Sequence, residues 1–175
     1  MRLRHIANQM DAANDDFSNY WALFERPFKC TCCCLARPEM TARSSSTNYG
    51  KVFEPCTVCD PMFHVKDGNN NVRWKVTADC CQCGICCRNG CGKCSEVSFP
   101  IYPAGETDYK PGREAGLIKK KFSGFQEFVS DADSFELYFP KNSTPEDKLL
   151  LIATVLMIDY RFYEDGGNDR NKRSY

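Results

Sequence analysis

The chain has 175 residues, a length that suits one domain with a substantial core and is short for two. Its 23 basic and 23 acidic residues balance, which excludes an overall field that would draw it to nucleic acid or an anionic membrane. There are 13 cysteines, and the N-terminus has no apolar core of the kind that a signal peptide requires. We therefore expect a reducing compartment, with most thiols free or bound to metal.

The first motif in chain order is the run ERPFKCTCCCLARP at residues 25–38. Cysteines this close together could be disulfide partners, metal ligands or thiols that are covalently modified. The lack of a signal peptide argues against disulfides, and the residues alone leave the other two chemistries open. The motif contains Cys30, Cys32, Cys33 and Cys34, with Arg26, Lys29 and Arg37 as basic neighbours.

Short strand-like runs separated by turn residues predict an antiparallel β architecture before the C-terminal segment. Residues 62–66 and 72–76 flank Asp67, Gly68 and three asparagines, which predicts a hairpin. The turn resembles the start of a calcium loop, but it lacks the glycine and the final glutamate of an EF-hand, so we expect only a turn. Further strands are expected at residues 48–55, 96–102, 115–122, 124–129 and 134–139.

The run SFELYF is the clearest of these strands. Phe135, Leu137 and Phe139 alternate with other residues and so place three apolar side chains on one face. Asp131 and Asp133 precede them at the same parity. If the strand begins as early as Asp131, these two carboxylates lie on the same face as the three apolar side chains.

A second group of cysteines occupies residues 80–94. Two CxxC pairs within it are separated by only four residues, which is tighter than the usual zinc-ribbon spacing. An alternative to metal binding is a cysteine-rich loop whose thiols are free or partly acylated. The cysteines better spaced to share a tetrahedral zinc ion are Cys56, Cys59, Cys83 and Cys86.

The segment STPEDKLLLIATVLMIDYRFYEDGG changes to a helical pattern, and we predict a helix over residues 145–165. Thr144 suits the N-cap, Pro145 the first helical position and Gly166 the stop. The centre is apolar on every side, so we expect it to be buried all round, within a sheet that curls around it. The residues expected to face the core or a membrane are Leu149, Leu150, Leu151, Ile152, Val155, Leu156, Met157 and Ile158.

A membrane-spanning helix needs about 20 mostly apolar residues. Asp159 and Arg161 interrupt this run too early for that length. Burial inside the protein is therefore the structure that we predict for the helix.

These segments resemble the motifs of the phospholipid scramblase family, in the same order. The matching runs are ERPFKCTCCC, EPCTVCDPMFHVKD, ADCCQCGICC, GLIKKKFSGFQEFVSDADSFELYFP and LLLIATVLMIDYRFYE. The most specific is FVSDADSFELYFP followed by the apolar helix. The resemblance implies a mainly β, Tubby-like fold, in which an antiparallel β-barrel surrounds a hydrophobic C-terminal helix.

The family's domain begins well before the segment that matches here, with several further strands, whereas this chain has only residues 1–17 in their place. An incomplete barrel would have open edges and part of its helix uncovered. We expect a divergent N-terminal segment at 1–19, a partial scramblase domain at 20–165 and a polar tail at 166–175.

The resemblance implies calcium-activated, ATP-independent, bidirectional movement of phospholipids between bilayer leaflets, with loss of membrane asymmetry and no covalent catalysis. It implies fatty acylation, by palmitate, at the first cysteine cluster, where several acyl chains beside basic residues would anchor the chain to a membrane. It also implies calcium binding at DADSFELYFPKN, with Asp131 and Asp133 at the first and third loop positions. Phe135 and Asn142 stand where further acidic or oxygen ligands would be.

The expected location is the cytoplasmic face of the plasma membrane, with acyl or single-pass attachment, or the nucleus when the chain is not acylated. The expected partners are membrane phospholipids and membrane-associated proteins. Lys119, Lys120 and Lys121 resemble a nuclear import region, but we expect mainly a solvated strand there, and zero net charge argues against DNA binding. The alternative function is an acylated, zinc-containing membrane adaptor or lipid-binding protein without transport activity.

Overall fold

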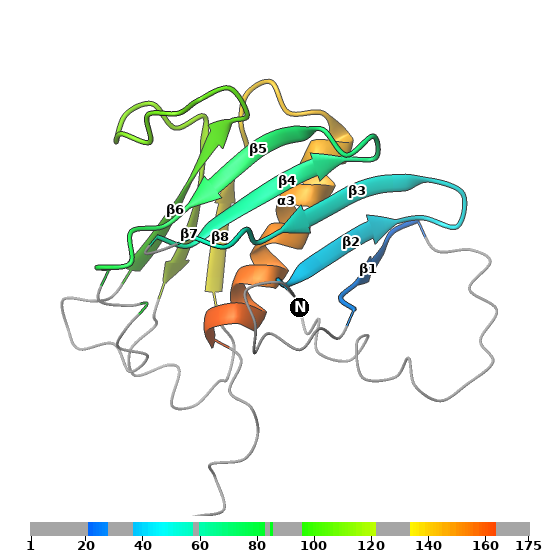
Figure 1. Ribbon diagram of the computed structural model, residues 1–175, viewed down its shortest axis with the longest axis horizontal. Coiled ribbons are helices and arrows are strands. Elements are labelled where there is room, and N and C mark those ends of the chain that lie inside the picture. Colours follow the sequence, from blue (N-terminus) through cyan, green and yellow to red (C-terminus); the bar gives the residue numbers. More distant parts are fainter. Residues whose placement is uncertain are drawn as a thin grey trace, which may run out of the picture.

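The structure, a computed structural model, describes residues 21–27, 37–57, 60–82, 85, 96–121 and 134–163. These residues form one β-sheet and a C-terminal helical segment (Figure 1). The strands are β1 (Leu23–Glu25), β2 (Glu39–Arg43), β3 (Asn48–Phe53), β4 (Met62–Asp67), β5 (Val72–Thr77), β6 (Glu96–Pro103), β7 (Gly116–Lys121) and β8 (Ser134–Tyr138).

The C-terminal segment is an α-helix, α3 (Pro145–Ile158), that continues as a short π-helix, η2 (Asp159–Tyr163). The Thr144 hydroxyl accepts a hydrogen bond from the Asp147 N–H at 3.2 Å, and the Asp147 carboxylate accepts one from the Thr144 N–H at 3.1 Å. This reciprocal capping box confirms the predicted N-terminus of the helix. Of the predicted helix over 145–165, the last two residues lie outside the described part of the chain.

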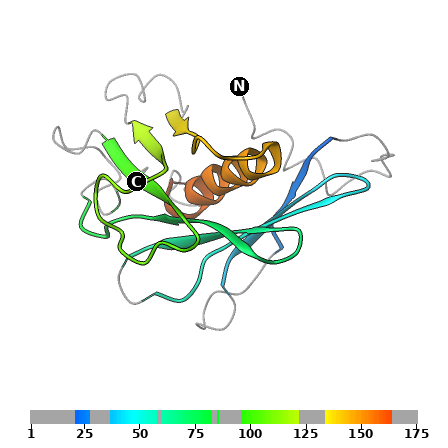
Figure 2. The same cartoon turned by 90° about the horizontal axis from the view of Figure 1, so that it is seen from above.

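Each strand pairs in antiparallel orientation with its neighbour in the chain, so the sheet order runs from β1 to β8. Within the described residues, β1 and β8 are each hydrogen-bonded on one side only, and the sheet does not close. Figure 2 shows the sheet curving around α3, with β1 (blue) and β8 (yellow) on opposite sides of the helix. The fold is therefore a mainly β, curled half-barrel around one helix, which confirms the predicted fold class.

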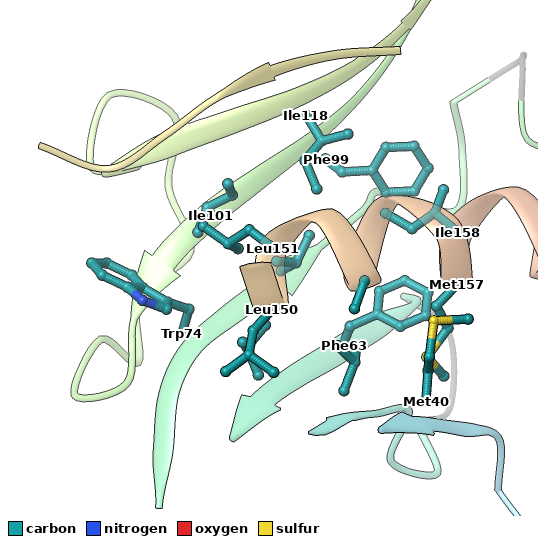
Figure 3. Packing of buried hydrophobic residues seen from close by; sticks show 14 of the residues in the cluster. Met40, Phe63, Trp74, Phe99, Ile101, Ile118, Leu150, Leu151, Met157 and Ile158 are labelled. Carbon is teal, nitrogen blue, oxygen red and sulfur yellow. The ribbon is translucent and has the colours of Figure 1, made fainter. Parts of the chain in front are cut away.

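The core lies between the concave face of the sheet and α3. Side chains alternate between the two faces of a strand, so Phe63 and Val65 of β4 are fully buried while Met62, His64 and Lys66 between them are only partly buried. Burial of each large apolar side chain contributes about 2–3 kcal/mol. Figure 3 shows the packing, whose buried members include Met40, Phe63, Trp74, Phe99, Ile101, Ile118, Leu150, Leu151, Met157 and Ile158.

The predicted hairpin is formed by β4 and β5. The Asp67 carboxylate accepts hydrogen bonds from the N–H groups of Asn69 and Asn71, both at 2.9 Å, and Asn70 takes the left-handed conformation with φ 66°. The bond from Asn71 is the main cause that holds the pKa of Asp67 below its usual value. The carboxylate is thus engaged within the turn, which confirms the prediction of a turn.

Most of the other predicted strands are confirmed as β3, β6, β7 and β8, whereas the expected strand at 124–129 lies outside the described residues. Two observed strands, β1 and β2, were not predicted. In β2 only Met40 and Ala42 face the core, which is too short an alternation to be recognised in the sequence.

Candidate functional site

The apolar residues predicted on the helix are distributed between a buried and an uncovered side of α3. Leu149, Leu150, Leu151, Met157 and Ile158 are at most 8% exposed, and Val155 and Leu156 are partly buried against the core. Ile152 is 39% exposed. The prediction of burial on all sides is therefore wrong at Ile152, because the open sheet does not cover that side of the helix.

An exposed apolar patch, made of Phe139 and Ile152, lies on this uncovered side. The Lys148 ammonium lies 5.6 Å from the centre of the Phe139 ring, and Ile152 is one helical turn beyond Lys148 on the same face. Phe139 was expected on the core face of its strand, but β8 ends at Tyr138 and Phe139 is 38% exposed, so that prediction is wrong. The patch combines apolar surface with a cation, a composition that suits the boundary of a lipid bilayer.

The C-terminal end of the helical segment is held by a buried carboxylate. Glu54, which follows β3 and is 3% exposed, forms ion pairs with Arg37 at 2.5 Å and with Arg161 of η2 at 3.3 Å. Arg26 stacks over the ring of Tyr160, also in η2, at 4.8 Å. Arg26 and Arg37 lie on either side of the cysteine motif in the sequence. Arg26 thus contacts the C-terminal end of the helical segment directly, and Arg37 is joined to it through Glu54.

Replacing Glu54 with glutamine is expected to lower the free energy of unfolding by about 2 kcal/mol, since it removes two charge-assisted contacts from a buried position. The matched control is Glu25→Gln, because Glu25 pairs with Arg43 where both side chains are 40% exposed or more. That change should cost less than about 1 kcal/mol. Urea denaturation followed by circular dichroism measures both, and equal losses for the two variants would contradict the central role of Glu54.

The prediction of a solvated strand at the three lysines is wrong for Lys120. Its side chain is 1% exposed and points into the half-barrel, where its ammonium lies 3.7 Å from the centre of the Tyr163 ring and 5.0 Å from that of Phe135. Lys119 and Lys121 point outward and pair with glutamates on β6 and β8. Lys120 therefore connects β7 to η2 through cation–π contacts, which are strengthened by burial.

Of the predicted zinc ligands, only Cys56 falls among the described residues, and it is exposed. Cys59, Cys83 and Cys86 lie outside them, so the predicted set remains a prediction. The structure instead brings together three other potential ligands, Asp79, Cys80 and Cys81, directly after β5.

Cys80 differs from a reactive surface cysteine. Hydrogen bonds from its thiol to the Asp60 carboxylate and to Cys81 raise its pKa to about 12. The thiolate is the nucleophilic form of cysteine, so Cys80 is a poor acceptor for acyl groups in this state.

The predicted lipid-anchor cysteines, Cys30, Cys32, Cys33 and Cys34, and the predicted calcium ligands, Asp131 and Asp133, lie outside the described residues. In the described remainder of the calcium segment, the Phe135 ring packs against Tyr163. The Glu136 carboxylate accepts hydrogen bonds from Lys121 at 2.6 Å and from the Tyr138 hydroxyl at 3.0 Å. Phe135 thus packs against the core of the half-barrel, and both carboxylate oxygens of Glu136 already accept hydrogen bonds.

An antiparallel meander that curls around an apolar C-terminal helix, with clustered cysteines before its second strand, defines the class of this protein. Comparison with known proteins agrees: residues 9–165 match the family described as Scramblase. The chain belongs to the scramblase family. No solved structure gives a significant match.

Curated relatives carry the same name. Rat phospholipid scramblase 1 is 28% identical over 153 residues, which cover 85% of this chain and 42% of the relative. Human phospholipid scramblase 2 is 30% identical over 145 residues, which cover 80% of this chain and 44% of the relative. Human phospholipid scramblase 4 is 25% identical over 153 residues, which cover 85% of this chain and 43% of the relative. The chain thus spans less than half the length of these relatives.

Within the described ranges, no helix combines the length and the apolarity that a bilayer crossing requires.

Proposed function

We propose that the protein moves phospholipids between the two leaflets of a membrane, in both directions, without ATP and in response to calcium. Membership in the scramblase family is the observation that carries this proposal. The reaction makes and breaks no covalent bond. The protein has to lower the cost of drawing a polar headgroup through hydrocarbon, which is several kcal/mol or more for each unsatisfied polar group.

The geometry supports this function through the uncovered side of α3. Ile152 and Phe139 offer apolar surface to acyl chains, and Lys148 between them offers a cation to a lipid phosphate. In the proposed arrangement, acylated cysteines hold the protein at the cytoplasmic face of the plasma membrane. Arg26, which precedes them, contacts Tyr160 of η2, and Arg37, which follows them, shares Glu54 with Arg161 of η2. These contacts would keep the C-terminal end of the helical segment near the bilayer.

Purified chain reconstituted into vesicles with a fluorescently labelled phospholipid tests the proposal. Dithionite destroys only the label in the outer leaflet, so exchange between leaflets raises the bleached fraction above that of protein-free vesicles. We expect calcium to produce this rise. We expect Asp131→Ala with Asp133→Ala to abolish the calcium dependence, because carboxylate oxygens are the ligands that calcium prefers.

The control for those substitutions is Asp108→Ala, which changes an acidic side chain in the loop between β6 and β7 that pairs with Lys110. It should leave calcium-dependent exchange unchanged. If wild-type protein gave no exchange with calcium, the transport proposal would be excluded. An unchanged calcium response in the double variant would exclude the proposed calcium ligands.

A second function is favoured by the burial of the helix. Leu150, Leu151 and Ile158 are at most 1% exposed, so the apolar surface of α3 is mostly engaged with the sheet rather than with lipid. An acyl-anchored adaptor that binds lipids or proteins would need no such surface. Membrane attachment without leaflet exchange in the vesicle assay would support the adaptor.

A further inference from the structure

Three side chains of metal-ligating type converge in the turn that follows β5. One carboxylate oxygen of Asp79 and the sulfurs of Cys80 and Cys81 all lie within 4.8 Å of one another. The two sulfurs are 3.9 Å apart. Asp79 and Cys81 are exposed and Cys80 is partly exposed, so an ion can reach all three from solvent.

The sulfur spacing fits a metal ion that is bound to both thiolates. Zinc binds thiolate sulfur at about 2.3 Å, and in a tetrahedral site two such sulfurs are about 3.8 Å apart. The observed 3.9 Å is close to this separation. The two sulfurs are therefore already at the separation that sharing one ion requires, and the Asp79 carboxylate supplies a third ligand of a type that zinc accepts.

Hydrogen bonds hold the turn in this conformation. The Cys80 N–H donates to the Asp60 carboxylate at 3.1 Å, and the Cys81 N–H donates to the Asp79 carboxylate at 2.8 Å. The Gln82 side chain accepts from the Ser98 N–H at 2.8 Å and donates to the Ser98 carbonyl at 2.9 Å. The ligands are thus fixed to β6 on one side and to the segment before β4 on the other, as in a preorganised site.

We propose that Asp79, Cys80 and Cys81 bind one zinc ion. The fourth position is taken by water or by the Asp60 carboxylate, which already accepts a hydrogen bond from the Cys80 thiol. Two sulfurs favour zinc over calcium or magnesium, which prefer oxygen ligands. On binding, the two thiols release their protons to solvent.

The ion would have a structural role at one end of the sheet. Asp60 lies in the connection between β3 and β4, and the three ligands lie in the connection between β5 and β6. A zinc ion that joins these two connections would stabilise the folded state. This site differs from the CxxC set considered from the sequence and shares no cysteine with it.

Cobalt substitution tests the proposal in the full chain. Co²⁺ bound to thiolate gives a charge-transfer band in the near ultraviolet and strong visible bands when it is tetrahedral. Reduced protein titrated with Co²⁺, and its zinc content after dialysis, are compared for wild type, Cys80→Ser with Cys81→Ser, and Asp79→Asn. Asp108→Asn is the matched control, because it makes the same change as Asp79→Asn at an acidic residue in the loop between β6 and β7, where Asp108 pairs with Lys110.

We expect the double variant to bind about one ion fewer per chain and to lose the corresponding thiolate band. Asp79→Asn should keep the band but bind Co²⁺ at least about tenfold more weakly. Asp108→Asn should match wild type. Equal metal content and absorption in wild type and the double variant would overturn the proposal, and so would equal weakening of Co²⁺ binding in Asp79→Asn and Asp108→Asn.

A second measurement needs no variant. Alkylation with iodoacetamide followed by mass spectrometry compares each cysteine with and without zinc. Zinc should slow the labelling of Cys81 at least about tenfold, since a bound thiolate is not free to react. Labelling that zinc does not change would overturn the site even if a variant had failed to fold.

Discussion

Replacing Leu151 with alanine is expected to lower the free energy of unfolding by about 3–4 kcal/mol, whereas Ile152→Ala should cost less than about 1.5 kcal/mol. The two residues are neighbours on α3 and lose similar volume. Leu151 is fully buried against the sheet, so its truncation leaves a cavity, while Ile152 is 39% exposed. Urea denaturation of both variants, read by circular dichroism, measures the difference.

The comparison also decides which surface of α3 contacts lipid. If the helix functions inside the half-barrel, Ile152→Ala should weaken binding to lipid vesicles while leaving the fold intact. Leu151→Ala should destabilise the fold, with no selective effect on lipid binding in the molecules that remain folded. Similar stability losses for the two variants would contradict the placement of the helix within the curled sheet.

The helix shows how far the sequence determined the fold. Thr144 and Pro145 predicted the N-terminus of the helix correctly, because capping depends on residues that are adjacent in the chain. The burial of each side depends on how far the sheet curls, which no local pattern encodes. The exposure of Ile152 could therefore not be predicted from an apolar run that has no polar face.

The burial of Lys120 was likewise not predicted from its local sequence. Its neighbours suggested a solvated basic run, but alternation along β7 places Lys120 on the opposite face from Lys119 and Lys121. Its burial arises from Tyr163, which is distant in sequence and follows the helix. Lys120 is two residues from Ile118, a core residue of the same strand, so both side chains point to the same face. This spacing was the sequence signal that could have indicated the burial of Lys120.

The proposed zinc ligands were missed for a different reason. Cys83 and Cys86 have the CxxC spacing that is common in zinc sites, so the sequence favours them as ligands. Adjacent cysteines are a less familiar pattern, and the contribution of Asp79 depends on the conformation of the turn. Gln82, which bonds to Ser98, fixes that conformation through a contact with β6 that has no local sequence signal.

Changing Cys30, Cys32, Cys33 and Cys34 together to serine is expected to remove palmitate labelling and reduce the membrane-bound fraction at least about 100-fold. One acyl chain gives only marginal binding, and each buried methylene adds about 0.8 kcal/mol, so losing several chains removes most of the affinity. Metabolic labelling with an alkynyl palmitate analogue and membrane flotation measure the two effects. Cys56→Ser, at an exposed cysteine outside the motif, should change neither.

Two of the three basic neighbours of these cysteines, Arg26 and Arg37, are expected to add little to membrane binding. Arg37 is paired with the buried Glu54, and Arg26 stacks on Tyr160, so both cations are engaged within the fold. Attraction to anionic headgroups would be screened by salt, whereas burial of acyl chains would not be. Wild-type protein should therefore stay on membranes in about 1 M salt, where the electrostatic screening length is only about 3 Å. Release by salt, or palmitate labelling that survives in the serine variant, would show that the attachment is made by other groups.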